Sequence, residues 1–137
     1  ARRLGIAAGM RLIEESKIVA DVLRTAGFEP FTVLCKVGSV EKTKVNIDEN
    51  LKIQKGNYEA CCNPILQARL LNREKTDLNV IVGLCVGHDA LFSKHSEAPV
   101  TTLVPKDRLT GHNPVVTLYT ATTYSKRIFD SQHLQSL

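Results

Sequence analysis

The sequence predicts a three-layer α/β domain with a mainly parallel sheet of about four to five strands and helices on both faces. Short apolar runs alternate along the chain with segments of helical periodicity. These runs are nearly continuous, as expected of strands that are buried on both faces. Strands separated by helices imply right-handed crossovers, so we expect a Rossmann-like architecture.

Four apolar runs are the predicted strands, at residues 3–8, 31–36, 78–83 and 100–106. Each run is short and is bounded by glycine, proline or charged residues, which is typical of strands rather than of buried helices. We therefore expect all four to lie in one sheet.

Three segments carry helix signals. Residues 11–28 place apolar side chains at helical spacing and include a glycine where a helix end favours one. Residues 63–72 open with Asn63, suited to the N-cap, and Pro64, suited to the first helical position. The same Asn-Pro signal recurs at 113–114 and predicts a further helix start there.

The length of 137 residues fits a single α/β domain over residues 1–137. Residues 38–58 are polar with weak alternation and predict a hairpin or an irregular loop. A connection longer than about 12–15 residues is unusual in a compact domain and is often functional. Because the chain begins almost directly with a predicted strand, it is compatible with a fragment whose natural start lies upstream.

The charge pattern narrows the class of partner. The formal net charge is +4, but basic and acidic residues are interleaved, and aromatic residues make up 5% with no Trp. Platforms for stacking bases are therefore scarce, and the sequence does not favour nucleic acid as a partner. With no apolar run near the roughly 18 residues of a membrane span and no secretory signal, we expect a cytoplasmic protein without a membrane partner. A homo-oligomer is compatible with the sequence.

Most residues with reactive side chains fall where predicted strands end or where the following helices begin. They are Cys35, Cys62, Cys85, His88, Asp89, His112 and Asn113. All strands of a parallel sheet end at one edge, where ligands of such sheets bind, so these side chains are expected to converge there. The remaining cysteine, Cys61, is assigned to packing, whereas His95 and His133 lie in polar surroundings and are expected to be exposed and inert.

One interpretation of this edge is a metal site. Thiolate and imidazole ligands suit zinc, and three cysteines also suit an iron–sulfur cluster. The local spacing of Cys85 and His88 is Cys-x2-His, while the other ligands come from distant segments. In a cytoplasmic setting the cysteines stay reduced and free to bind metal.

A second interpretation is a cysteine-dependent enzyme, a hydrolase or transferase. The segment GLCVG fits Gly-x-Cys-x-Gly, a turn that exposes a nucleophile above a sheet, with Cys85 as that nucleophile. His112 or His88 would serve as base, with Asp89 as a further candidate catalytic residue. Asn63, Asn113 or backbone N–H groups would stabilise an oxyanion.

Two further functions, a structural role for the edge and dinucleotide binding, have less support from the sequence. Polar groups could merely hold the edge of the sheet together, but that would not explain why Cys and His gather there. Dinucleotide binding is not supported, because AAGMRL follows the first strand in place of a Gly-x-Gly-x-x-Gly turn. A metal ion or a small molecule is therefore the expected partner.

The segments CNPILQA, TDLNVIVGLCVGHDALF, APVTTLVPKDR and GHNPVVTLY together resemble the domain of unknown function 1847 family. This is a group of uncharacterised prokaryotic proteins that are often labelled metal-binding, and the resemblance covers about residues 3–125. It implies importance for Cys35, Cys62, Asn63, Pro64, Cys85, His88, Asp89, Lys106, Asp107, Arg108, His112, Asn113 and Pro114. Of these, the expected contacts of a cofactor or small molecule are Asn63, Lys106, Asp107, Arg108 and Asn113.

The sequence departs from the family pattern at its start. Family members carry a further cysteine just after the first strand and a cysteine-rich segment upstream, whereas this sequence has Gly9 near the first of these positions. The metal hypothesis therefore rests on Cys35, Cys62 and Cys85, with His88, ahead of His112, as the fourth ligand. The expected cofactor is zinc or an iron–sulfur cluster.

Overall fold

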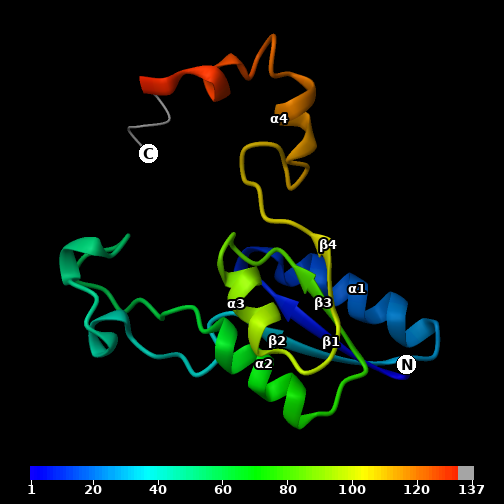
Figure 1. Cartoon of the computed structure of the whole chain (residues 1–137). Helices are drawn as coiled ribbons and strands as arrows, with labels where there is room; N and C mark the ends of the chain where they lie inside the picture. Colours follow the sequence, from blue (N-terminus) through cyan, green and yellow to red (C-terminus); the bar gives the residue numbers. More distant parts are fainter. Residues whose placement is uncertain (133–137) are drawn as a thin grey trace.

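The structure is a computed structural model that describes residues 1–132, and within them it contains one sheet of four strands (Figure 1). The strands are β1 (Arg3–Ala8), β2 (Glu29–Leu34), β3 (Leu78–Val82) and β4 (Val100–Val104). Their order is β2-β1-β3-β4, and each adjacent pair is parallel. The predicted parallel sheet is confirmed.

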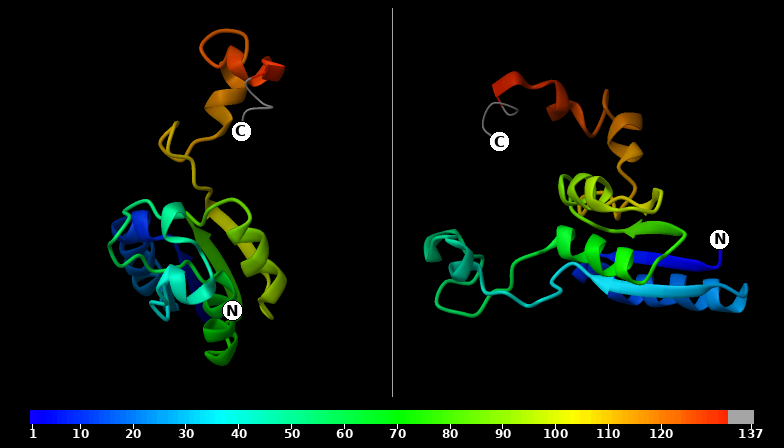
Figure 2. Two further views of the ribbon diagram at one scale, coloured as in Figure 1. Left: turned by 90° about the vertical axis from the view of Figure 1, so that its left-hand side faces the viewer. Right: turned by 60° about the horizontal axis from the view of Figure 1, so that its bottom comes forward.

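Helices cover both faces of this sheet (Figure 2). On one face lies α1 (Ile13–Thr25), which follows the 3₁₀ turn η1 (Met10–Leu12) and is followed by Gly27 with φ of 86°. On the other face lie α2 (Pro64–Arg73) and α3 (His88–His95), which also contact each other. The predicted three-layer α/β class is therefore confirmed.

The hydrophobic core divides between the two faces as strand geometry requires. Successive side chains of a strand point to opposite faces, so Ile6 and Ala8 of β1 belong to the α1 side and Ala7 to the other side. On that other side Leu71 of α2 and Phe92 of α3 are fully buried. Burial of each such large side chain stabilises the fold by about 1.5–3 kcal/mol.

The second strand is displaced from its predicted position. It begins at Glu29, two residues early, because the register pairs Arg3 with Glu29. The Glu29 N–H donates to the Arg2 carbonyl at 2.9 Å, and the two side chains form an ion pair at 2.7 Å. The strand also ends earlier, at Leu34, so Cys35 lies in the turn after it.

Residues 38–58, here called the β2–α2 excursion, form an irregular projection beyond the carboxyl edge of the sheet (Figure 1). It contains the 3₁₀ turns η2 (Lys42–Val45) and η3 (Glu49–Leu51). The Lys52 side chain, only 5% exposed, pairs with Glu41 at 2.5 Å and with Glu49 at 2.8 Å. These ion pairs hold the excursion together where apolar packing is scarce.

The segment after β4 stands away from the sheet (Figures 1 and 2). It contains the short helix α4 (Val115–Tyr119) and the 3₁₀ turn η4 (Lys126–Phe129). The predicted cap at Asn113 is not formed, since Pro114 occupies the N-cap position and no side chain caps the helix. Leu118 and Tyr119 are exposed, so no apolar face is buried that would extend this helix.

The structure also bears on the expectations for membrane spans and for the two remaining histidines. None of the helices within residues 1–132 combines the length and the apolar composition that crossing a bilayer requires. The His95 ring is half-buried and its Nδ1 lies 2.8 Å from the Leu91 carbonyl, so this residue is less exposed than expected. His133 lies outside the described residues.

Candidate functional site

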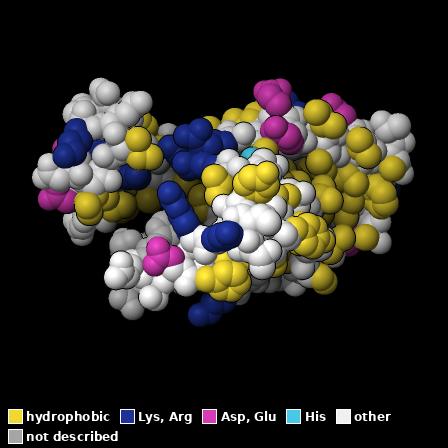
Figure 3. All heavy atoms as spheres, turned by 90° about the horizontal axis from the view of Figure 1, so that it is seen from above, with side chains coloured by type: hydrophobic (Ala, Val, Ile, Leu, Met, Phe, Trp, Pro, Cys, Tyr) yellow, Lys and Arg dark blue, Asp and Glu magenta, His cyan; other side chains and the backbone are white. Residues whose placement is uncertain are grey.

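Three cysteines line one pocket of about 360 Å³ at the carboxyl edge of the sheet. Cys35 follows β2, Cys62 precedes α2 and Cys85 follows β3. Other parts of the wall come from the turn after β1, the β2–α2 excursion and the segment after β4. Figure 3, a view from above, shows several Lys and Arg side chains gathered between the left-hand part of the molecule and its centre.

Backbone hydrogen bonds fix the first two cysteines beside each other. The Cys35 N–H donates to the Ala8 carbonyl at 2.8 Å and extends the β1–β2 ladder by one residue. The Asn63 N–H donates to the Cys35 carbonyl at 2.6 Å, which ties the start of α2 to the end of β2. The Asn63 side chain accepts from the Leu66 N–H at 2.9 Å as the predicted cap. Cys62 is thereby held against Cys35.

The Cys62 Sγ donates a hydrogen bond to the Cys35 Sγ across 3.7 Å, and the Met10 N–H donates to the same Cys35 sulfur at 3.4 Å. The Cys62 bond is the main reason why the pKa of Cys35 is lowered to about 6. Burial opposes this effect, while the Met10 N–H and the ammonium groups of Lys106 and Lys36 reinforce it. The pKa of Cys62 is raised, because this thiol is the donor to Cys35 and is itself partly buried. Cys35 is thus the residue of the pair that ionises first.

Cys85 is presented by a turn between β3 and α3. Gly83 has φ of 69° and Gly87 has φ of 90°, a left-handed region that favours glycine. The Cys85 carbonyl accepts from the N–H groups of His88 at 2.9 Å and Asp89 at 3.2 Å. The Cys85 sulfur accepts from the Lys106 ammonium group at 3.4 Å.

The other predicted residues of the β3–α3 turn have structural contacts. His88 begins α3 and does not belong to the pocket lining. The Asp89 carboxylate accepts from the N–H groups of Gly87 and Ala90, each at 2.8 Å, and so stabilises the start of α3. The structure therefore brings neither side chain to the pocket lining that contains the cysteines.

In the segment after β4, some predicted residues line the pocket and others make structural contacts elsewhere. Lys106 and Arg108 line the pocket, whereas the Asp107 carboxylate accepts from the Leu109 N–H and the Thr110 hydroxyl. The Thr110 bond is the main cause of a lowered pKa at Asp107. His112 Nδ1 accepts from the Asp107 N–H at 3.1 Å. This ring nitrogen is engaged away from Cys85, and Asn63 and Asn113 are likewise absent from the pocket lining.

Sequence reasoning misses several residues of the pocket wall. Arg11 belongs to the turn after β1, and Lys36 directly follows Cys35. Lys42 lies near the start of the β2–α2 excursion and pairs with Glu59, which directly follows the excursion. The rule that parallel strands end at one edge could have indicated both Arg11 and Lys36, because Arg11 closely follows a predicted strand and Lys36 ends one. The excursion carries no sequence signal of this kind.

The arrangement does not form a complete metal site in this conformation. Within residues 1–132, no three His, Cys, Asp or Glu side chains are grouped closely enough to hold an ion. The donor set nevertheless contains three thiols on one pocket wall, two of them in contact. Cys61 contributes no part of this lining, and its N–H donates to the Val40 carbonyl at 2.7 Å.

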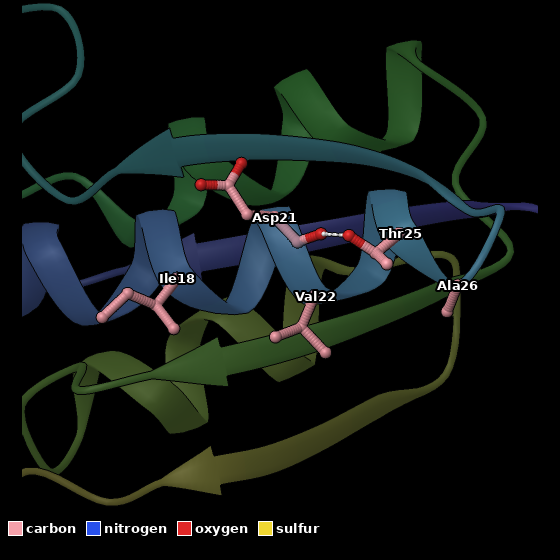
Figure 4. Close-up of a pocket in the computed structure, with 5 residues that line it drawn as sticks. All are labelled: Ile18, Asp21, Val22, Thr25 and Ala26. Atoms are coloured by element: carbon pink, nitrogen blue, oxygen red, sulfur yellow. Dashed lines mark hydrogen bonds between the residues drawn. The ribbon is translucent and has the colours of Figure 1, made fainter.

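A second hollow of about 440 Å³ lies on the outer side of α1 (Figure 4). Ile18, Val22 and Ala26 give it an apolar wall, and the Thr25 hydroxyl donates to the Asp21 carbonyl at 2.9 Å. The Asp21 carboxylate pairs with Arg24 at 2.6 Å. This hollow has no cysteine or histidine and a single carboxylate in its lining, so the cysteine pocket is the candidate site.

Comparisons with known proteins place the chain in a family. The chain belongs to the family described as "Protein of unknown function (DUF1847)", whose profile matches residues 1–103. It is also similar to "Uncharacterized protein MJ0455" of Methanocaldococcus jannaschii, with 45% identity over 131 residues. That match covers 96% of this chain but 65% of the relative, so the chain spans less than two thirds of the relative's length. No solved structure matches the chain.

Proposed function

We propose that this protein binds a thiophilic metal, as zinc or an iron–sulfur cluster, through Cys35, Cys62 and Cys85. The supporting observation is the separation of 3.7 Å between the Cys35 and Cys62 sulfurs. Two sulfurs bound tetrahedrally to one zinc ion at about 2.3 Å lie about 3.8 Å apart. The pair is therefore spaced as two ligands of one ion would be.

The electrostatics of the pocket also suit this role. A thiol must lose its proton before it binds a metal, and the Met10 N–H together with Lys36 and Lys106 favours the Cys35 thiolate. Bound metal would supply the positive charge that the Cys62 thiol needs to ionise. Cysteines held reduced for this purpose fit a cytoplasmic setting, which we include in the proposal.

The third and fourth ligands of the proposed metal would have to change their present contacts. Cys85 would exchange its Lys106 contact for the metal. His88 would reach the site only if its ring turned toward the pocket, because it does not line the wall now. A ligand that enters the pocket could occupy the fourth position without such a movement.

Metal analysis of protein purified without air tests the proposal, with Cys62→Ser compared against Cys61→Ser. We expect stoichiometric zinc or iron in the wild type, most of it lost in Cys62→Ser, because the adjacent sulfurs act together. Cys61→Ser is a matched control, since that cysteine lies outside the pocket lining. Equal metal in the two variants would contradict the proposal. So would a wild type that stays free of metal after reconstitution with zinc, or with iron and sulfide.

A cysteine-dependent enzyme is the second candidate, with Cys85 as nucleophile. The contact of 3.4 Å from the Lys106 ammonium group to the Cys85 sulfur favours it, because this donor holds the sulfur of the proposed nucleophile in the pocket. Lys106→Met should then slow alkylation of Cys85 by iodoacetamide, whether or not a chelator is present. A metal site instead predicts that bound metal protects Cys35, Cys62 and Cys85 together and that a chelator exposes all three.

A further inference from the structure

The wall of the cysteine pocket contains more basic side chains than carboxylates that could neutralise them. Its basic side chains are Arg11, Lys36, Lys42, Lys106 and Arg108. Glu59 is the one carboxylate in this lining, and it pairs with Lys42. Four cations therefore remain. Within residues 1–132 none of them forms an ion pair with a carboxylate.

The proposed metal would not balance this charge. Three thiolates on a divalent ion carry one net negative charge, whereas four unpaired cations face the same space. Like charges gathered around a partly enclosed pocket repel one another and attract counter-ions. A small anion is the species that would relieve this repulsion.

The four cations are placed by elements that end at the same edge of the sheet. Arg11 follows β1, Lys36 follows β2, and Lys106 and Arg108 follow β4. They thus approach one volume from several strands. Both arginines carry a planar fork that matches carboxylate and phosphate oxygens.

The size of the pocket agrees with a ligand larger than an ion. Its volume of about 360 Å³ lies within the range of roughly 300–1,000 Å³ that is usual for small-molecule sites. A metal ion held by the thiols at one side would leave most of this space free. The apolar side chains of Met10 and Ile53 also line it and could contact the uncharged part of a ligand.

We propose that the pocket binds a small, multiply charged oxyanion next to the cysteines, with Arg11, Lys36 and Arg108 as its main charged contacts. Lys106 would divide its contacts between the ligand and Cys85. The proposal shares its pocket with the proposed metal site but does not require that a metal is bound.

Calorimetric titration of the reduced, metal-free protein tests this assignment, with pyrophosphate as one probe and citrate as the other. The two probes separate phosphate from carboxylate chemistry. We expect one of them to bind at a single site and to bind more weakly as salt is added, because salt screens charges. Arg11→Gln and Lys36→Gln should each weaken binding by about tenfold, the loss of one charge-assisted contact.

Arg73→Gln is the matched control, because it removes the same charge from an exposed position in the last turn of α2. It should leave the affinity unchanged. The proposal is overturned if neither probe binds, if Arg11→Gln and Lys36→Gln bind as the wild type does, or if Arg73→Gln loses as much affinity as they do. Metal content is measured separately on untreated protein. Metal retained without any oxyanion affinity rejects this proposal alone, and oxyanion affinity in protein that never holds metal rejects the metal proposal alone.

Discussion

The sulfurs of Cys35 and Cys62 lie 3.7 Å apart, although 27 positions separate the two residues in the chain. The contact exists because the Asn63 N–H donates to the Cys35 carbonyl and joins the start of α2 to the end of β2. A pair this close can share a metal ion, share a proton or form a disulfide.

Mild oxidation of the metal-free protein should join Cys35 to Cys62. The two sulfurs are in contact, and the lowered pKa of Cys35, about 6, supplies the thiolate that disulfide formation requires. After treatment with diamide, peptide mapping by mass spectrometry should find this crosslink before any other. It should persist in Cys61→Ser and be absent from Cys62→Ser. A crosslink formed first through Cys61 would contradict the geometry.

The Cys35 thiolate should form as the pH rises through about 6, well below the ordinary thiol value of 9.0. Cys62→Ala removes the S–H donor that lowers the Cys35 pKa most, so the midpoint should move to higher pH. The rate of Cys35 alkylation, followed by mass spectrometry from about pH 5 to pH 9, measures both midpoints. In Cys61→Ala the midpoint should stay where it is in the wild type. An unchanged midpoint in Cys62→Ala would show that this hydrogen bond does not control the titration.

The two Asn-Pro pairs should differ in their contributions to stability. Asn63 caps α2 through the Leu66 N–H, so Asn63→Ala should lower the free energy of unfolding by about 1 kcal/mol. The Asn113 side chain caps no helix, and Asn113→Ala should stay within about 0.5 kcal/mol of the wild type. Urea denaturation measures both. Equal losses in the two variants would mean that the cap is not what distinguishes these positions.

Gly9 should resist substitution because of a neighbouring backbone and not because of its own dihedral angles. Its φ is −78°, which any residue adopts, but a Cβ added there would lie 2.0 Å from the Gly83 carbonyl oxygen. Gly9→Ala should therefore cost about 3 kcal/mol or more, since backbone must shift. A cysteine at this position would meet the same contact.

Gly27 provides the comparison for Gly9, because it has φ of 86° and nothing within 4 Å of an added Cβ. Gly27→Ala should cost only about 1–2 kcal/mol, the penalty of a left-handed backbone. Urea denaturation of the two variants ranks the effects. A Gly9→Ala protein as stable as Gly27→Ala would indicate that β3 and the turn after β1 can separate easily.

The sequence by itself determines the parallel sheet and the edge at which its chemistry collects. The apolar runs of the strands and the helix-start signal at Asn63 are both local features. Each depends on a short stretch of chain, so the sequence is sufficient to predict it. Because all strands of a parallel sheet end at one edge, Cys35, Cys62 and Cys85 are then expected on one side of the molecule. This expectation uses only the order of elements and the common direction of the strands.

Only the tertiary structure decides which of the predicted side chains meet. Lys106 contacts Cys85 from across the β3–β4 pair, whereas His112 accepts from the Asp107 N–H and is not part of the pocket wall. Arg11 and Lys36 join the wall without any motif to identify them. The direction of a side chain depends on local dihedral angles and on contacts between distant segments. Neither of these leaves a periodic trace in the sequence.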